Sequence, residues 1–255
     1  MSDAISPAAL TSYGEALSVA VIGASGGIGG AFLSALEATP AVGRVFAFSR
    51  REIISACPKT TWRALDLEDE DSIARGAETA ASVSAALHLV IVATGVLHAG
   101  DSLQPEKTWR SLNAVSLQRA FAVNATGPAM VAKHFLPLLA RDRKAVFAAL
   151  SARVGSIGDN QLGGWYAYRA SKAALNMLIR TYSVELGRRN AQALCVGLHP
   201  GTVDSSLSRP FQGGVPDGKL FSPAQAAGQL LEVLDGLSPE DSGGLFAWDG
   251  QRIPF

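Results

Sequence analysis

The strongest chemical signal lies in the second half of the chain, where Tyr168 and Lys172 are four residues apart. They lie in a segment of helical composition, so their side chains share one face of the predicted helix. Carbonyl reduction needs a proton donor at the oxygen as hydride reaches the carbon, and the reverse reaction needs a base. A phenol with a pKa of about 10 does this poorly, and a neighbouring ammonium lowers that pKa. The pair predicts acid–base chemistry, although an exposed Tyr–Lys pair on a helix has the same spacing.

A glycine-rich turn near the start of the chain predicts a dinucleotide site. A run of apolar residues at 19–22 leads into Gly23, Ala24, Ser25, Gly26, Gly27, Ile28 and Gly29, and then into a predicted helix. Such a turn places a pyrophosphate on backbone N–H groups at the N-terminus of a helix. A turn without a ligand is one alternative. A hydrolase nucleophile at Ser25 is another, but no earlier strand exists to supply its oxyanion hole.

The end of the second predicted strand indicates which dinucleotide binds. An NAD site would have an acidic residue there, about 20 residues after the turn, to accept from the ribose 2′-hydroxyl. This chain has no acidic residue between Glu37 and Glu52, and it has Ser49, Arg50 and Arg51 instead. Guanidinium groups bind phosphate through charge-assisted hydrogen bonds. The sequence therefore predicts NADP(H) rather than NAD(H).

A single sheet is expected to hold these residues together. Short apolar runs alternate with helical segments through the whole chain. The runs are 19–22, 45–48, 62–65, 89–92, 145–150, 193–198 and 245–248, and the helical segments are 29–38, 68–81, 105–139 (broken before Pro128), 166–189 and 223–234. Continuous apolar runs are typical of parallel strands covered on both faces. We predict one α/β domain over residues 18–255, a doubly wound Rossmann fold with a parallel, seven-stranded sheet, preceded by a short arm at 1–17.

From about residue 19 to 255 the chain resembles the short-chain dehydrogenases/reductases. The resemblance rests on Gly23-x-x-x-Gly27-Ile28-Gly29, Leu65-Asp66-Leu67, Val123-Asn124-x-x-Gly127, Tyr168-x-x-x-Lys172 and Pro200-Gly201. Residues 164–172 and 249–255 are most similar to the carbonyl-reductase and C-factor branch. The resemblance implies an NADP(H)-dependent oxidoreductase that interconverts a carbonyl and an alcohol on a small, mostly apolar substrate.

The resemblance also implies roles for individual residues. Tyr168 would be the acid/base, Lys172 would lower its pKa and hold the ribose hydroxyls, and Asn124 would kink its helix and anchor a proton-relay water. Cofactor contacts are implied for Asp66 and Leu67 at the adenine, for Ala93, Thr94 and Gly95 after the fourth strand, and for Pro200, Gly201, Thr202 and Val203 at the nicotinamide.

One departure from the family pattern concerns the substrate oxygen. The usual Ser-Ser-x-x-Gly reads Ser151-Ala152-Arg153-Val154-Gly155, so Ala152 aligns with the serine that holds this oxygen. In a regular strand Ser151 points to the opposite face, and it reaches the substrate only through a bulge. Ser151 is kept as a candidate catalytic residue. The departure leaves an alternative open, a regulatory or signalling protein that binds NADP(H) with little turnover.

Composition excludes several classes of partner. The chain has 22 Lys and Arg against 22 Asp and Glu, which argues against nucleic acid and anionic membranes as partners. The charge-free stretches 16–36 and 79–100 reach the length of a membrane span, but their flanks are acidic rather than basic. The four scattered histidines, among them His199, show no metal spacing and are expected to be structural or superficial.

Location, assembly and substrate access are less directly indicated. The start of the chain lacks the basic segment of a signal peptide, so we expect a cytoplasmic protein in which Cys57 and Cys195 are free thiols. Segments 128–139 and 166–189 are apolar enough for the homodimer or homotetramer that is usual in the family. The glycine-containing apolar segment 200–222 is either a loop that closes over the substrate or an ordinary surface loop.

Overall fold

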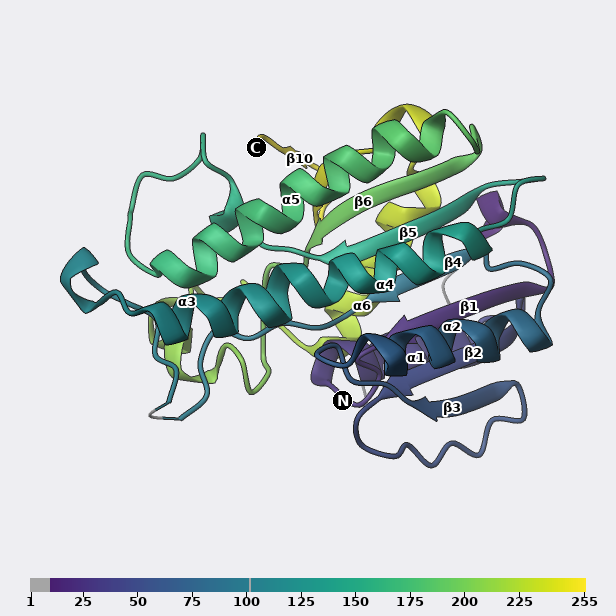
Figure 1. The fold of residues 1–255 in the computed structure, drawn as a ribbon, viewed down its shortest axis with the longest axis horizontal. Helices are drawn as coiled ribbons and strands as arrows, with labels where there is room; N and C mark the ends of the chain where they lie inside the picture. The colour runs from purple at the N-terminus through teal and green to yellow at the C-terminus, as the bar shows by residue number, and fades with distance from the viewer. Residues whose placement is uncertain (1–9, 101) are drawn as a thin grey trace.

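A central sheet of eight strands organises the computed structural model, which describes residues 10–100 and 102–255 (Figure 1). Its order is β10-β9-β6-β5-β4-β1-β2-β3. The strands are β1 (Leu17–Ile22), β2 (Val42–Ser49), β3 (Thr60–Ala64), β4 (Leu89–Val92), β5 (Ala145–Leu150), β6 (Ala193–His199), β9 (Leu245–Ala247) and β10 (Arg252–Ile253). All seven expected strands are present and mutually parallel. The eighth, β10, pairs antiparallel with β9 and was not predicted, because two residues are too few to show a pattern.

Helices cover both faces of this sheet, as the continuous apolar strands require. They are α1 (Gly27–Ala38), α2 (Glu70–Val83), α3 (Ala114–Phe121), α4 (Gly127–Phe135), α5 (Tyr166–Gly187) and α6 (Pro223–Gly236). Buried side chains of α1 and α6 share one core with the sheet, and those of α2, α4 and α5 share the other (Figure 1). Every residue of β4 and of β5 is buried between these two layers.

The helix expected over 105–139 differs from the prediction. It begins only at Ala114, where the side chain of Asn113 accepts a hydrogen bond from the N–H of Ser116. No break separates α3 from α4; a π-helical turn, Ala122–Thr126, joins them. Pro128 lies in the first turn of α4. Because proline has no N–H to donate, the carbonyl of Asn124, four residues earlier, loses its helical partner, and the wider turn occurs here.

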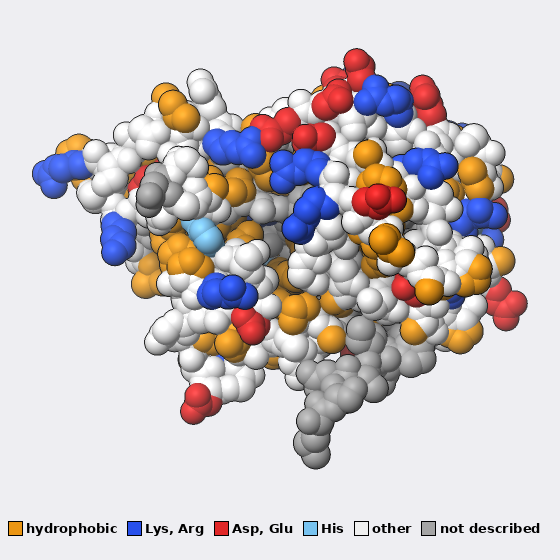
Figure 2. All heavy atoms as spheres, turned by 90° about the horizontal axis from the view of Figure 1, so that it is seen from below, with side chains coloured by type: hydrophobic (Ala, Val, Ile, Leu, Met, Phe, Trp, Pro, Cys, Tyr) orange, Lys and Arg blue, Asp and Glu red, His pale blue; other side chains and the backbone are white. Residues whose placement is uncertain are grey.

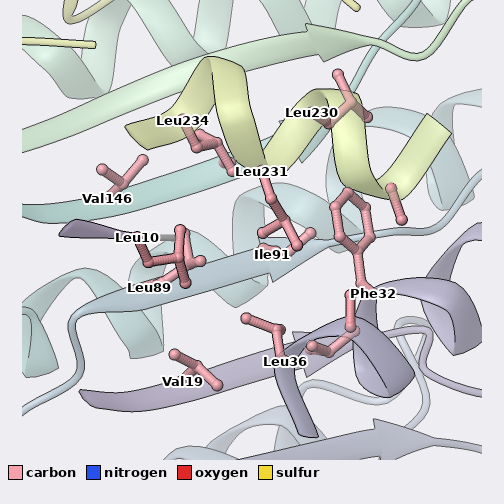
Figure 3. Close-up of a cluster of buried hydrophobic side chains, with 14 of the residues drawn as sticks. Leu10, Val19, Phe32, Leu36, Leu89, Ile91, Val146, Leu230, Leu231 and Leu234 are labelled. Carbon is pink, nitrogen blue, oxygen red and sulfur yellow. The ribbon is translucent and has the colours of Figure 1, made fainter. Parts of the chain in front are cut away.

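Part of the expected N-terminal arm belongs to the core. Residues 1–9 lie outside the described part of the chain, but Leu10 and Tyr13 are buried against α6 and the sheet, and Figure 3 shows Leu10 among the side chains of this core. The short 3-10 turn Thr11–Tyr13 is fixed by Asp235, whose carboxylate accepts from the N–H of Thr11 at 3.2 Å and that of Ser12 at 2.9 Å.

The topology determines where a ligand site can form. On one side of β1 the sheet continues with β2 and β3, and on the other side it continues with β4, β5 and β6. In such open sheets ligands bind outside the carboxyl ends of the strands, at the point where the order reverses. A small second sheet of β7 (Thr202–Val203) and β8 (Leu220–Phe221) is formed by the segments that follow β6. Among the described residues, none of the helices has the length and apolar character to cross a membrane.

Candidate active site

A cavity of about 700 Å³ lies at the carboxyl ends of β1, β2, β3 and β4. Its wall contains most of the residues predicted to bind the cofactor: Gly23, Ser25, Ser49, Arg50, Arg51, Asp66, Leu67, Ala93, Thr94 and Gly95. In the view of Figure 2, Lys and Arg side chains lie beside a hollow in the middle of the face, with Asp and Glu side chains next to them. The fold therefore gathers these residues from four separate segments into one site.

The glycine turn between β1 and α1 has no room for a side chain at Gly23 or at Gly29. Gly23 has a φ of +89°, and a Cβ there would lie 2.7 Å from Cγ2 of Thr94. A Cβ on Gly29 would lie 2.1 Å from the carbonyl oxygen of Gly23. Gly27 is the first residue of α1, and Ile28 follows it and reaches the second pocket described below. The turn thus brings the N-terminus of α1 to the cavity, where its free N–H groups favour an anion.

Two arginines follow β2 at the edge of the cavity. Nη2 of Arg51 donates to the carbonyl oxygen of Ser25 at 3.2 Å, and the Ser49 hydroxyl donates to the carbonyl of Arg51 at 2.6 Å. Trp62 in turn donates to the Ser49 hydroxyl at 3.1 Å. In the described part of the chain no hydrogen bond or ion pair occupies the side chain of Arg50. Both guanidinium groups are exposed at the cavity, with donors free for an anion.

An ion pair at the cavity wall was not predicted. Arg119, on α3, donates to the carboxylate of Glu68, which follows β3. Both residues line the cavity, beside Asp66 and Leu67. The carboxylate of Asp66 accepts from the N–H of Glu68 at 3.1 Å, which fixes the turn after β3. No local pattern indicates this pair, because its members are 51 residues apart.

Asn124 ties three segments together behind the cavity. Its Oδ1 accepts from the N–H of Val96 at 2.8 Å, and its Nδ2 donates to the Val96 carbonyl at 2.9 Å and to the Ser171 hydroxyl at 3.0 Å. Asn124 is completely buried and lies within the π turn Ala122–Thr126. Asn124 therefore fixes the segment after β4 against α5. In this segment the hydroxyl oxygen of Thr94 is buried without a hydrogen-bond partner.

Tyr168 and Lys172 lie on one face of α5, as predicted. Nζ of Lys172 is buried, donates to the carbonyl oxygen of Leu150 at 2.7 Å, and lies 5.9 Å from the centre of the Tyr168 ring. It also lies 3.5 Å from the position of a Cβ on Gly95, at the wall of the large cavity. Burial raises the pKa of Tyr168 to about 12 and lowers the pKa of Lys172 to about 7. The lowered phenol pKa expected from the sequence is therefore not found, because burial dominates both groups.

A second, smaller pocket of about 220 Å³ contains Tyr168 in its wall. Pro200, Gly201, Thr202 and Val203 line it, as do Ser151 and Ile28. Leu207 and Phe211, from the segment between β7 and β8, complete the wall, and the ring of Phe211 lies 5.0 Å from that of Trp165. Residues of segment 200–222 therefore form part of the pocket wall.

Ser151 lines this pocket, but the proton of its hydroxyl is engaged by another side chain. The hydroxyl donates to Oδ1 of Asn176 on α5 at 2.6 Å, and the next residue, Ala152, lines the pocket. This is the strand alternation that the sequence indicated. His199, expected to be structural or superficial, also lines the pocket, and its Nδ1 is buried without a partner. Burial, aided by the charge of Arg153, lowers the pKa of His199 to about 4.

Glu106 was also not predicted. It is buried and accepts from the N–H of Ala167 at 3.1 Å, while its carbonyl oxygen accepts from the N–H of Trp165 at 2.6 Å. It therefore caps the N-terminus of α5, and Tyr168 lies in the first turn of this helix. Glu106 is 61 residues from Ala167 in the sequence, so no local sequence pattern indicates this role.

Comparison with known proteins decides the family. The family model described as short chain dehydrogenase matches residues 18–213, well over half of the chain. The chain belongs to the short chain dehydrogenase family. This short chain dehydrogenase is 39% identical to the C-signal of Myxococcus xanthus over 150 residues, which cover 58% of the chain and 85% of that protein. It is 36% identical to 1-hydroxy-2-glutathionyl-2-methyl-3-butene dehydrogenase of Rhodococcus sp. over 140 residues, 55% of the chain and 59% of that enzyme.

Solved structures agree with this assignment. The short chain dehydrogenase superposes on NADPH-bound carbonyl reductase from chicken fatty liver with a TM-score of 0.79 and 28% identity, covering 94% of this chain and 100% of that one. The carbonyl reductase Sniffer of D. melanogaster has a TM-score of 0.78 at 22% identity, with the same coverage, and shows the fold alone. The family and its relatives make the chain an oxidoreductase with a Rossmann-like α/β fold.

Proposed function

We propose that the chain is an NADP(H)-dependent oxidoreductase that interconverts a carbonyl and an alcohol by hydride transfer, with Tyr168 as the acid/base. One observation carries the proposal. A single turn of α5 places Lys172 behind Gly95 at the large cavity and Tyr168 in the wall of the small pocket. A cofactor in the first cavity and a substrate in the second would therefore meet beside these two side chains.

The residues around the large cavity fit NADP(H). The cavity borders the glycine turn at the N-terminus of α1, where a pyrophosphate would meet free N–H groups. The two arginines offer free donors to a 2′-phosphate, and the buried Thr94 hydroxyl lacks a partner that a bound ligand would supply. The residues that would hold the cofactor are Gly23, Ser25, Gly27, Ile28 and Gly29 at the pyrophosphate, Ser49, Arg50 and Arg51 at the 2′-phosphate, Asp66 and Leu67 at the adenine, Ala93, Thr94, Gly95 and Lys172 at the riboses, and Pro200, Gly201, Thr202 and Val203 at the nicotinamide. The NADPH held by the chicken reductase supports the choice of cofactor.

The chain's own residues would manage the proton. When bound, NADPH supplies the hydride. Tyr168 would donate its proton to the carbonyl oxygen in reduction and would accept a proton in the reverse reaction. Lys172 and Asn124 act as positioning residues: the first is fixed to the end of β5, and the second joins α5 to the segment after β4.

A second candidate function follows from the substrate pocket. The Ser151 hydroxyl is engaged by Asn176, and Ala152 offers no hydroxyl to orient a carbonyl. Of the candidate catalytic residues, Ser151 therefore has the weakest geometric support. The similarity to the C-signal protein points the same way. The alternative is a regulatory or signalling protein that binds NADP(H) with little turnover.

We also propose a cytoplasmic homodimer or homotetramer with a small-molecule substrate and no nucleic-acid or membrane partner. Met177 and Val184 on α5 are 66% and 45% exposed, so this helix presents apolar side chains that a second copy would cover. Light scattering on a size-exclusion column measures the assembly directly.

The two candidate functions differ in one measurement. A panel of ketones and aldehydes is incubated with NADPH, and loss of NADPH absorbance is followed for the parent and for Tyr168→Phe. An enzyme consumes NADPH with at least one of these compounds, and the variant loses that activity while still binding NADPH. Binding of NADPH without consumption favours the regulatory protein, and equal consumption by the variant refutes the role of Tyr168.

A further inference from the structure

The pocket beside Tyr168 has apolar and neutral polar side chains in its wall, together with one cation. Among the described residues that line it, Arg153 is the only charged one. No Asp or Glu side chain lines it, and His199 is neutral near pH 7 because its pKa is lowered to about 4. Much of the remaining wall is apolar, including Leu97, Trp165 and Phe211.

Arg153 keeps donors free for a ligand. It begins the 3-10 turn Arg153–Gly155 directly after β5 and Ala152. Its Nη1 donates to Oδ2 of Asp159 at 3.2 Å, and its side chain is 44% exposed. Asp159 does not line the pocket. A guanidinium carries five N–H donors, and a single contact with Asp159 leaves most of them unused.

The position of Arg153 relates it to the reacting end of the pocket. Leu150, at the end of β5, pairs with Leu198 of β6, and His199 is the next residue. Arg153 is near enough to His199 for its charge to add to the effect of burial and lower the pKa of His199. Ala152, His199 and Tyr168 share the pocket with it. A neutral oxygen accepts only an ordinary hydrogen bond from a guanidinium, whereas a carboxylate gains a stronger, charge-assisted and often bidentate contact.

We propose that Arg153 binds an anionic group of the substrate, so that the preferred carbonyl compounds are short oxo acids in which an apolar chain joins the carbonyl to a carboxylate. The carbonyl end lies at Tyr168 and the carboxylate at Arg153. The carbonyl end rests on the function proposed above; the anion site does not.

The first test compares one carbonyl compound in charged and neutral form. NADPH consumption is measured with levulinate and with methyl levulinate, which share the ketone and differ in the carboxylate. The parent should show a kcat/KM at least about tenfold higher for levulinate, the range expected for a hydrogen bond to a charged group. Arg153→Met should remove this preference, and Asp159→Asn, which leaves the guanidinium in place, should retain it. Equal kcat/KM values in the parent, or loss of the preference in Asp159→Asn as well, would overturn the proposal.

The second test needs no turnover. Pentanoate and pentanamide, similar in size but different in charge, are titrated by calorimetry into the protein with and without NADP⁺. Tighter binding of pentanoate that is lost in Arg153→Met and partly kept in Arg153→Lys supports the anion site. This result stands even if no NADPH is consumed, an outcome that would refute the proposed function alone. Equal binding of both compounds, in variants whose Tm matches the parent's, refutes the anion site even where NADPH is consumed.

Discussion

Nζ of Lys172 donates a 2.7 Å hydrogen bond to the carbonyl oxygen of Leu150, the last residue of β5. This bond fixes α5 to the carboxyl end of the sheet. Tyr168, one turn earlier on the same helix, is thereby held in the wall of the small pocket. This contact between a helix and a strand therefore helps to hold both side chains at the two cavities, together with the bond from Asn124 to Ser171.

Lys172→Met should alter the pH dependence of stability in a defined direction. Burial lowers the pKa of Lys172 to about 7 in the folded chain, against about 10.4 for an exposed lysine. Between these values the unfolded chain binds more protons, so this residue's contribution to folded stability rises with pH. The stability of the variant minus that of the parent, measured as free energy of unfolding, should therefore be larger at pH 6 than at pH 10.

Urea denaturation at both pH values measures this effect. Lys59→Met is the control, because Lys59 also donates to main-chain carbonyls, those of Thr39 and Val42. A relative stability of Lys172→Met that improves from pH 6 to pH 10 would contradict the expectation.

NADPH should bind at least about tenfold more tightly than NADH, because two guanidinium groups meet the 2′-phosphate. Arg50→Ala and Arg51→Ala should each weaken NADPH binding by about tenfold and leave NADH binding nearly unchanged. Fluorescence titration measures both dissociation constants. Arg63→Ala is the control, because Arg63 is exposed and lies outside the cavity wall. Equal constants for the two cofactors in the parent would refute the assignment.

Ala152→Ser should raise kcat/KM for a carbonyl substrate by at least about tenfold, because it supplies a donor to the substrate oxygen. Ala152 is 8% exposed and lines the pocket, so a hydroxyl there reaches a ligand. Steady-state kinetics measure the effect. An unchanged or lower kcat/KM would mean that another group already orients the carbonyl.

Ser151→Ala is the matched control for this substitution. It should reduce the free energy of unfolding by about 1–2 kcal/mol, because Oδ1 of the buried Asn176 loses its donor. The KM should change little. A large rise in KM without loss of stability would show that the Ser151 hydroxyl reaches the substrate.

Much of the site was predictable because its determinants are local in sequence. The seven parallel strands, the glycine turn and the spacing of Tyr168 and Lys172 each follow from a short segment. The alternation of a regular strand was enough to indicate that Ser151 faces α5 and Ala152 the pocket. The fold then joins segments whose order along a doubly wound sheet is nearly fixed.

The remaining features depend on contacts between distant segments. Glu106 caps α5 from 61 residues away, and Arg119 pairs with Glu68 across the cavity wall. The continuous helix through Pro128 depends on a π turn, for which helix propensity gives no signal. The pKa of Tyr168 is raised rather than lowered because the depth of burial comes from tertiary packing.

Asp235→Asn should reduce the free energy of unfolding by about 1 kcal/mol at pH 7, as for other lost caps. Partial burial raises the pKa of Asp235, but hydrogen bonds from Ser12 and Thr11 outweigh it and lower that pKa. The stabilisation is therefore present above pH 4 and is lost as the pH falls below about 4. Urea denaturation across this range tests it, with the exposed Asp217→Asn as control. A difference between variant and parent that grows on acidification would contradict the account.

The most direct test of the central claim is to follow the hydride itself. The protein is incubated with a carbonyl compound that it reduces and with NADPH deuterated at the nicotinamide C4, and the alcohol is analysed by mass spectrometry. We predict that the alcohol carries one deuterium, that NADH replaces NADPH poorly, and that Tyr168→Phe forms almost none of this product. Deuterium-free alcohol, or labelled alcohol formed equally fast by Tyr168→Phe, would contradict it.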